Sequence, residues 1–460
     1  MDNYQQVNKY RKDILKSVFD LIKIPSVKSK AEKDAPYGLA LKEALNYVLD
    51  LGEKKGFTVI NYDNYAGEIC FGEGDEIVGV ICHLDVVPPQ DKGWKKPPFE
   101  PYIENNIIYG RGSNDNKGPS MAAFYALVAL KEMGFKPRKK LKMVFGCDEE
   151  GLMTCMDYYK SKTDGLPTKG FVPDGTFPLN YGEHGLYALK IDRKLPDYLI
   201  TLRAGEHYHI LAETALATIK HYPANIEELF SFFLRTNNYF GELKIEKETA
   251  TIKLKGKAAH GSRPYVGHSA AAGILMFLAA LYQDEELSEL ALCLSNWLGK
   301  ELNINYRSEK YGELYSGFTM LETKDDTLSC FVDIRYPANL KGEEILLKIN
   351  ERLVKTKLVE KITAVDDRPG FYIEPDSENI RTLWDIYSRV SKDNINEPKV
   401  SAGDTYARKF SGLFAYGPTT RNHLADKRIG QAHQVNEGMD IETLITGCSI
   451  YFEALKTLLE

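Results

Sequence analysis

Gly79-Val80-Ile81-Cys82-His83-Leu84-Asp85 is a short apolar segment that leads directly into a His-x-Asp pair. Two further segments place acidic residues in a comparable setting: Gly110-Arg111-Gly112-Ser113-Asn114-Asp115-Asn116-Lys117-Gly118 and Phe145-Gly146-Cys147-Asp148-Glu149-Glu150. Imidazole and carboxylate groups that meet at strand ends are the ligands that a hydrolytic metal centre needs. The three segments therefore predict a metal site, and the pattern around them predicts the fold.

Helix and strand signals alternate on both sides of these segments. Helices are expected near residues 6–23, 37–55 and 120–133 and after residue 150, and strands near residues 58–61, 68–71, 77–82 and 140–145. Such alternation predicts an α/β fold, a mostly parallel sheet covered by helices on both faces. Ligands of such sheets bind beyond the carboxyl ends of the strands, which is where His83 and Glu150 fall.

Near Leu186 the pattern changes, and apolar and polar residues begin to alternate with a period of two, as in residues 250–255 and 328–335. Amphipathic helices are expected near residues 268–282 and 342–355. This combination predicts a separate α+β insert with an antiparallel sheet.

The Pro/Gly/Asp segment at residues 366–370 marks the end of the insert. Helices expected near residues 379–393 and 440–459 then return the chain to the first domain. We therefore expect a catalytic domain made of residues 1–185 and 373–460, interrupted by an inserted domain over residues 186–372.

The composition is that of a soluble globular protein. The chain has 460 residues, and at this length two domains are expected rather than one core. Lys and Arg total 59 against 65 Asp and Glu, which gives a net charge of -6, and the basic residues are scattered. Nucleic acid is therefore not an expected partner.

The chain also lacks signals for a membrane or for export. Its N-terminus is polar and without a signal-peptide pattern, and no apolar run approaches the length of a membrane span. The seven cysteines are an odd number, lie mostly inside apolar patterns and form no Cys-x-x-Cys pair. We expect reduced, buried cysteines in a cytoplasmic protein with no membrane contact.

The His-x-Asp pair suits one metal ligand and its supporting partner. In an extended segment His83 and Asp85 point to the same side, so the Asp85 carboxylate can accept a hydrogen bond from the imidazole nitrogen that does not face the metal. A lone His-x-Asp is weak evidence, because polar residues gather at many strand ends.

The carboxylates that follow strengthen this interpretation. Asp115 lies in a glycine-flanked loop before a helix, where by itself it would be an ordinary turn or N-cap residue. Glu149 and Glu150 follow an apolar strand, and two like charges there cost stability unless a cation or a proton compensates. One glutamate can bind a metal while the other acts as general base toward a water molecule.

Two later segments offer further ligands. Asp174 closes the apolar strand of Gly170-Phe171-Val172-Pro173-Asp174-Gly175, and His433 lies in Gln431-Ala432-His433-Gln434-Val435-Asn436-Glu437. Each could also be a turn or surface residue, and neither decides the function alone.

Together these segments resemble the co-catalytic metallopeptidases and deacylases that include carboxypeptidase G, acetylornithine deacetylase, succinyl-diaminopimelate desuccinylase, carnosinase and bacterial dipeptidase V. The resemblance runs from Ile24-Pro25-Ser26-Val27 to the His433 segment, with the pieces in the family's order. The dipeptidase V branch is the most similar, on three features: His83-Leu84-Asp85-Val86-Val87-Pro88, Trp94 with Pro98-Phe99, and Asp174-Gly175-Thr176-Phe177-Pro178.

The resemblance implies a dinuclear site with two ligand sets: His83, Asp115 and Asp174 for one metal ion, and Asp115, Glu150 and His433 for the other. Asp115 would bridge the two ions. Glu149 would be the general base, and Asp85 would support His83. The resemblance also implies a cis peptide bond between Asp115 and the following residue.

The insert resembles the family's lid, which closes on the substrate. Residues 258–264, Ala-Ala-His-Gly-Ser-Arg-Pro, match the lid motif, so His260 would polarise the scissile carbonyl. Arg335 would bind the terminal carboxylate of the substrate, although an exposed arginine in a salt bridge would show the same pattern. The enlarged lid favours a monomer.

Four positions depart from the family pattern. Asn116 replaces a second aspartate, His209 stands where relatives have an asparagine near the substrate, His268 replaces another asparagine, and Asp404 interrupts a glycine-rich segment. The metal ligands are untouched, but the substrate preference is open. His209 is assigned to substrate binding, while an ordinary structural role for both histidines is the alternative.

The sequence thus predicts a metal-dependent dipeptidase that removes the N-terminal residue from dipeptides or very short peptides. Nitrogen and oxygen ligands without thiolate suit two divalent ions, Zn or Mn. An N-acyl amino acid deacylase would use the same metals and base on a different amide. A non-catalytic peptide-binding relative is the third alternative, but such a protein would have no need for Glu149.

Overall fold

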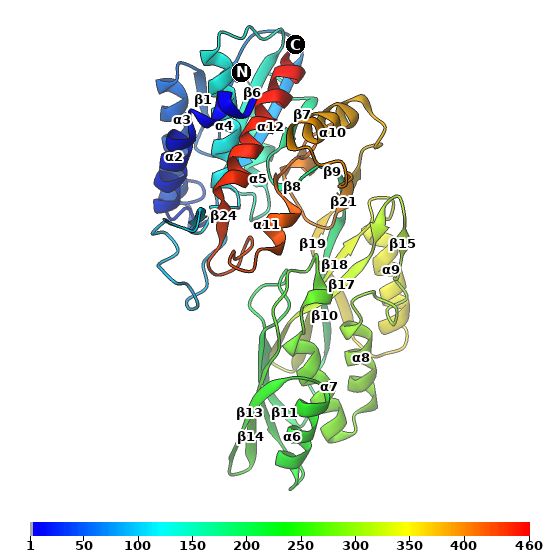
Figure 1. The fold of residues 1–460 in the computed structure, drawn as a ribbon. Helices are drawn as coiled ribbons and strands as arrows, with labels where there is room; N and C mark the ends of the chain where they lie inside the picture. Colours follow the sequence, from blue (N-terminus) through cyan, green and yellow to red (C-terminus); the bar gives the residue numbers. More distant parts are fainter. Residues whose placement is uncertain (1–2) are drawn as a thin grey trace. The chain divides into compact units, whose positions relative to one another are not determined.

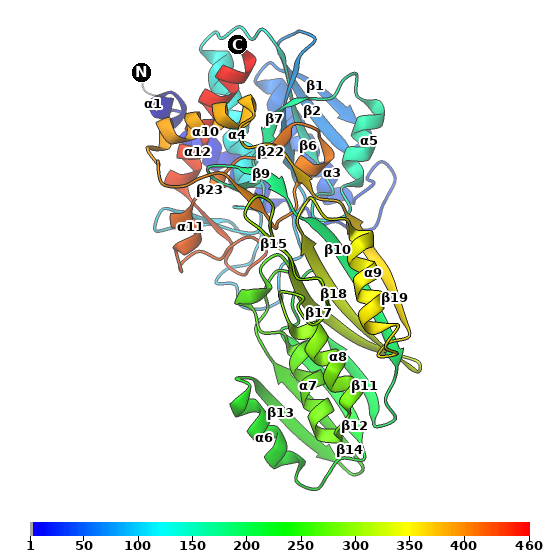
Figure 2. The same cartoon turned by 90° about the vertical axis from the view of Figure 1, so that its right-hand side faces the viewer.

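The computed structural model describes residues 3–460 and divides into two compact units (Figures 1 and 2). Unit 1 comprises the residues up to Tyr181 together with Ile373–Lys399 and Asp404–Glu460. Unit 2 comprises Gly182–Tyr372 and Val400–Gly403. Met1 and Asp2, the start of the polar N-terminus noted above, lie outside the described residues.

Unit 1 is built on a sheet whose four central strands are parallel. Its strand order is β1 (Thr58–Tyr62), β2 (Ala66–Phe71), β6 (Lys140–Gly146), β3 (Ile77–His83), β7 (Lys169–Val172) and β22 (Leu413–Ala415), followed by β9 (Asn180–Glu183). The contacts from β6 to β22 are parallel, whereas β1, β2 and β9 pair in the antiparallel sense. The predicted α/β fold is confirmed.

Helices cover both faces of this sheet. The helices of unit 1 are α1 (Asn3–Asn8), α2 (Arg11–Lys23), α3 (Leu39–Lys54), α4 (Lys117–Glu132), α5 (Thr154–Lys162), α10 (Glu378–Ser391), α11 (Arg421–Ala425) and α12 (Ile441–Leu459), and α3, α4 and α5 contact the sheet directly. Neighbouring strand residues point to opposite faces. Gly67 of β2 accordingly lies against Leu49 of α3, whereas Glu68 accepts a hydrogen bond from Tyr159 of α5 at 2.7 Å.

Short elements complete unit 1. They are β4 (Tyr102–Glu104), β5 (Ile107–Tyr109), β8 (Gly175–Thr176), β23 (Pro418–Thr419), β24 (Gly438–Asp440) and the 3-10 turn η2 (Tyr406–Lys409). Strands β20 (Phe371–Tyr372) and β21 (Lys399–Ser401) both pair with β9, where the chain passes from one unit into the other.

Unit 2 contains an eight-stranded antiparallel sheet. Its order is β13 (Phe240–Glu246), β14 (Thr249–Lys255), β12 (Thr214–Lys220), β11 (Leu199–Ala204), β17 (Tyr315–Lys324), β18 (Thr327–Tyr336), β10 (Gly185–Lys194) and β19 (Lys361–Arg368). Every pairing in the sheet is antiparallel. The alternation of apolar and polar residues in the sequence therefore correctly predicted an antiparallel sheet.

One hydrophobic core joins this sheet to its helices. The helices are α6 (Ile226–Thr236), α7 (Ala270–Tyr282), α8 (Glu285–Ser295) and α9 (Gly342–Leu353), with the 3-10 turn η1 (Pro264–Val266) and the hairpin of β15 (Arg307–Ser308) and β16 (Gly312–Glu313). Helix α7 packs against β12, β14 and β17, and α9 packs against β10.

The structure refines several predicted elements. The helix expected over residues 6–23 is two helices, because the chain turns at Lys9-Tyr10 between α1 and α2. Helices α6 and α8 were not predicted.

In residues 3–460 no helix is both long and apolar enough to cross a membrane. All seven cysteines are free, and six of them are buried.

Candidate metal centre

The strand order of unit 1 brings the carboxyl ends of three strands to one edge of the sheet. His83 is the last residue of β3 and pairs with Gly146, the last residue of its parallel neighbour β6. Strand β7 lies on the other side of β3, also parallel. The segments after these strands carry Glu149, Glu150 and Asp174, while Asp115 and His433 come from loops before α4 and β24.

Asp115 stands between the two imidazoles. Its Oδ1 lies 2.9 Å from His83 Nε2, and its Oδ2 lies 3.2 Å from His433 Nε2. Each histidine nitrogen also faces a second carboxylate. Asp174 Oδ2 lies 3.4 Å from His83 Nε2, and Glu150 Oε1 lies 3.0 Å from His433 Nε2.

The potential ligand atoms form two compact groups. In the first group, His83, Glu149 and Asp174 place one atom each within 4.8 Å of one another. In the second group, Asp115, Glu150 and His433 do the same. The peptide bond between Asp115 and Asn116 is cis, as the resemblance implied.

The second nitrogen of His83 has a different partner from the one predicted. His83 Nδ1 lies 3.0 Å from the backbone carbonyl of Asp85, whereas the Asp85 carboxylate is 3.6 Å away. That carboxylate instead accepts hydrogen bonds from the backbone N–H groups of Glu149 and Glu150, at 3.0 and 2.9 Å. Asp85 therefore orients the histidine through its main chain and fixes the two-glutamate segment through its side chain.

Sequence reasoning missed Glu437 as a functional residue. Its Oε1 accepts hydrogen bonds from the N–H groups of Gly112, Asn114 and Asp115, at 3.0, 3.0 and 3.1 Å. Its Oε2 pairs with the buried Arg111 at 2.6 Å. Glu437 thus shapes the loop that presents Asp115. The only sequence signal was its place at the end of the His433 segment.

The electrostatics of the site favour a bound cation. Burial raises the pKa of Glu149 well above its ordinary value, and the nearby charge of Asp174 raises it further. Burial and neighbouring carboxylates likewise raise the pKa values of Glu150 and Asp174. A metal ion would compensate this concentration of negative charge.

The two imidazoles hold Asp115 ionised. Burial alone would raise the pKa of Asp115, but hydrogen bonds from His433 and His83 outweigh burial and place its pKa well below the usual range. For both histidines burial lowers the pKa, but the surrounding carboxylates raise it well above the ordinary value. An anionic Asp115 with one oxygen toward each histidine has the chemistry of a bridging ligand.

The residues present fit divalent ions. Glu149 Oε1 is buried and has no hydrogen-bond partner among residues 3–460, so one carboxylate oxygen is available to a water molecule or an ion. The donor atoms are imidazole nitrogens and carboxylate oxygens, which are ordinary ligands of divalent metal ions.

The sequence matches the model of "Peptidase family M20/M25/M40" over residues 79–457. The chain belongs to this family. A protein of Staphylococcus aureus (strain USA300) named "Putative dipeptidase" is 30% identical over 472 aligned residues, which cover 99% of this chain and 98% of that protein.

Two solved structures have a similar fold to this M20/M25/M40 peptidase. Human carnosine dipeptidase 1 matches with a TM-score of 0.60 at 14% identity, over 99% of each chain. The di-peptidase Dug1p of Saccharomyces cerevisiae matches with a TM-score of 0.61 at 14% identity, over 99% of this chain and 98% of that chain.

In this M20/M25/M40 peptidase the other predicted site residues belong to unit 2. Arg335 is 1% exposed, so the alternative of an exposed strand arginine is wrong. Its Nε and Nη2 donate to the two carboxylate oxygens of Asp333 at 2.8 and 3.0 Å. His209 Nδ1 lies 3.1 Å from the same carboxylate. The sequence did not single out Asp333, although it lies two residues before Arg335 on the same strand.

His260 lies in a tight loop beside this cluster. Its Nδ1 is 2.7 Å from Ser262 Oγ, and the neighbouring Gly261 N–H donates to the carbonyl of His209 at 2.7 Å. The Asp333 carboxylate leaves no room for a Cβ atom at Gly261. Unit 2 therefore brings His209, His260 and Arg335 together.

We expect Asp333→Asn to lower the free energy of unfolding of this M20/M25/M40 peptidase by about 3–5 kcal/mol, because it leaves the buried Arg335 unpaired. Burial raises the pKa of Asp333, but Arg335 and His209 outweigh it and bring the pKa well below the ordinary value. The stabilisation from this lowered pKa is therefore present above about pH 4 and is lost as the pH falls.

Urea unfolding of the wild type and the variant measures this effect. The difference in the free energy of unfolding between wild type and variant should be largest at pH 7 and should become smaller below about pH 4. Asp326→Asn, at an exposed turn of the same hairpin, is the matched control and should behave as wild type. An equal stability of Asp333→Asn and wild type at pH 7 would contradict the prediction.

Proposed function

We propose that this chain is a metal-dependent dipeptidase that hydrolyses dipeptides or very short peptides from the N-terminus. The observation that carries the proposal is the placement of Asp115 between His83 and His433, one carboxylate oxygen toward each. In this assignment His83, Asp115 and Asp174 hold one divalent ion, and Asp115, Glu150 and His433 hold the other. The family and the "Putative dipeptidase" relative support the reaction class.

Two divalent ions, when bound, lower the pKa of a water molecule and polarise the peptide carbonyl. The chain's own groups perform the proton transfers. Glu149 accepts the proton of the attacking water on its unpaired Oε1, and the same oxygen then donates that proton to the leaving amine nitrogen. Asp85 holds the Glu149 backbone in place for this task.

Unit 2 supplies the groups that bind the peptide, and we propose that it acts as the lid of the catalytic unit 1. His260 donates to the scissile carbonyl oxygen as negative charge develops there. Arg335 binds the terminal carboxylate of the substrate. Asp333 takes the N–H of Nε and one N–H of Nη2, so the second N–H of Nη2 and the Nη1 group, which lies 3.4 Å from the Ala402 carbonyl, remain for the substrate. His209, held by Asp333, lines the same site.

A substrate panel tests this proposal. Purified protein supplied with Zn or Mn should hydrolyse dipeptides, should act more weakly on tripeptides, and should leave acetylated and succinylated amino acids intact. Turnover of the N-acyl amino acids with dipeptides untouched would assign a deacylase instead. Peptide binding without any amide hydrolysis would assign a non-catalytic binding protein.

Metal identity, assembly and location complete the proposal. We propose Zn or Mn as the ions, which activity and metal content after reloading with each ion would distinguish. The large single-chain lid supports a monomer, which sedimentation equilibrium would test. Free and mostly buried cysteines support a cytoplasmic location.

A further inference from the structure

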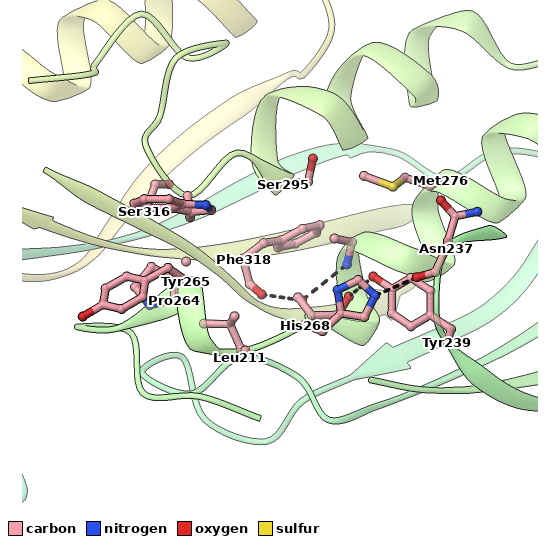
Figure 3. Close-up of a pocket in the computed structure, with 15 residues that line it drawn as sticks. Leu211, Asn237, Tyr239, Pro264, Tyr265, His268, Met276, Ser295, Ser316 and Phe318 are labelled. Carbon is pink, nitrogen blue, oxygen red and sulfur yellow. Dashed lines mark hydrogen bonds between the residues drawn. The ribbon is translucent and has the colours of Figure 1, made fainter. Parts of the chain in front are cut away.

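Unit 2 contains a cavity that the dipeptidase mechanism does not use. Its volume is about 390 Å³, within the range of small-molecule sites. Tyr265 and Pro264 lie at one end and the His268–Tyr239 pair lies at the other, with Ser295 and Met276 above (Figure 3). The cavity is bounded by the end of α8, one side of α7, strand β17 and the loop around η1.

The Ser316 and Phe318 side chains that line the cavity lie on the opposite face of the sheet from the Asp333–Arg335 pair. Ser316 and Phe318, which line it, pair across the sheet with Ile334 and Val332. Paired residues share a face and neighbouring residues alternate, so Asp333 and Arg335 point to the other side. This part of the cavity wall therefore faces away from the proposed carboxylate site.

Aromatic rings form much of the cavity wall. His268 is stacked on Tyr239, with ring centroids 3.9 Å apart and an interplanar angle of 23°. Toward the other end, the Tyr265 and Trp297 rings lie 5.6 Å apart. Flat side chains on two sides suit a flat guest, because ring faces and edges attract one another. His268 is one of the four residues that depart from the family pattern.

Two polar groups of the wall are available to a guest. Ser316 is 2% exposed, and its hydroxyl has no hydrogen-bond partner among residues 3–460. A buried hydroxyl without a partner is costly, so a guest that pairs with it gains affinity. His268 Nε2 donates to the Asn237 carbonyl at 3.0 Å, so Nδ1 is the ring nitrogen that remains for a guest.

The wall carries no acidic side chain and no lysine or arginine among the described residues that line it. A peptide or a free amino acid would bring an ammonium and a carboxylate group, and each would lose hydration without a charged partner. The chemistry of the wall therefore disfavours the substrates and products of the proposed reaction. It favours an uncharged guest.

We propose that this cavity is a second ligand site, which binds a small uncharged molecule with a flat aromatic ring and a hydrogen-bonding group that pairs with Ser316. The ring lies between the Tyr265–Trp297 and His268–Tyr239 pairs. The site acts independently of peptide hydrolysis, so its test measures binding and does not depend on the dipeptidase assignment.

Calorimetric titration of the full-length, metal-loaded protein with indole and with L-tryptophan tests the proposal. The two probes share a ring, but only tryptophan is charged. Indole should bind at one site per chain, at least about tenfold more tightly than tryptophan. Ser316→Ala should weaken indole binding by about fivefold, because it removes one hydrogen bond.

Two variants of α8 provide the matched comparison. Ser295→Phe fills the cavity from its rim and should weaken indole binding at least about tenfold, whereas Ser288→Phe on the exposed side of the helix should not change it. Met276→Trp fills the cavity from α7 and serves if Ser295→Phe does not fold. The proposal is overturned if indole fails to bind at about 1 mM, if tryptophan binds equally well, or if the cavity-filling variant binds indole as wild type does.

Discussion

Glu149→Gln should reduce kcat toward a dipeptide by about 10²–10⁴-fold, the contribution usual for a general acid–base group. The amide has nearly the same shape as the carboxylate but cannot take up a proton from water. The backbone N–H of residue 149 still bonds to Asp85, so the two-glutamate segment should keep its place. The metal content should therefore match that of wild type.

Steady-state kinetics and metal analysis of the same sample separate the alternatives. Glu53→Gln, an exposed change on α3, is the control and should retain full activity. Persistent turnover in Glu149→Gln would show that another group takes the proton. A loss of metal would instead make Glu149 a ligand, which its place in a group with His83 and Asp174 makes geometrically feasible.

Asp115→Ala should remove both metal ions and all measurable hydrolysis, because this one side chain faces both histidines. Ligands that serve only one ion should have smaller effects on metal content. Asp174→Ala and Glu150→Ala should each retain about one of two ions. The expected order of metal content separates a bridging carboxylate from two independent sites.

Metal content after dialysis, measured with far-UV circular dichroism on the same samples, provides this test. Asp115→Asn keeps the shape of the side chain, so it provides the same test if the alanine variant does not fold. If Asp115→Ala retained one ion while Glu150→Ala or Asp174→Ala lost both, the assignment of the bridge would be wrong.

The sequence predicted the residues that lie together at the sheet edge because three of them follow apolar strands that are parallel to one another. An apolar strand followed by a polar group marks its own carboxyl end, so the sequence pattern alone places His83, Glu149 and Asp174 at strand ends. The antiparallel sheet of unit 2 was predicted from a different signal, the two-residue alternation of residues 250–255 and 328–335. Asp115 and His433 lie in loops, and the family resemblance placed them.

Supporting contacts could not be predicted in the same way. Glu437 lies more than 300 residues along the chain from the amides whose hydrogen bonds it accepts, and no local sequence pattern predicts such a pairing. Asp85 was expected to bond to its neighbour His83, but its carboxylate reaches the amides that follow β6 instead. The local geometry of an extended segment allows the predicted contact between Asp85 and His83. The observed contact with the amides of Glu149 and Glu150 arises because β3 and β6 are parallel neighbours, so their carboxyl ends lie side by side.

The buried carboxylates of Asp85 and Glu437 have a consequence for how the protein acquires its ions. Together they accept hydrogen bonds from five main-chain amides around the candidate metal centre. The protein itself therefore holds the loop of Asp115 and the segment of Glu149 and Glu150 in place. Ion capture then demands little reorganisation of the main chain. A chelated preparation should stay intact in storage and should regain its ions on simple remixing, without a refolding step.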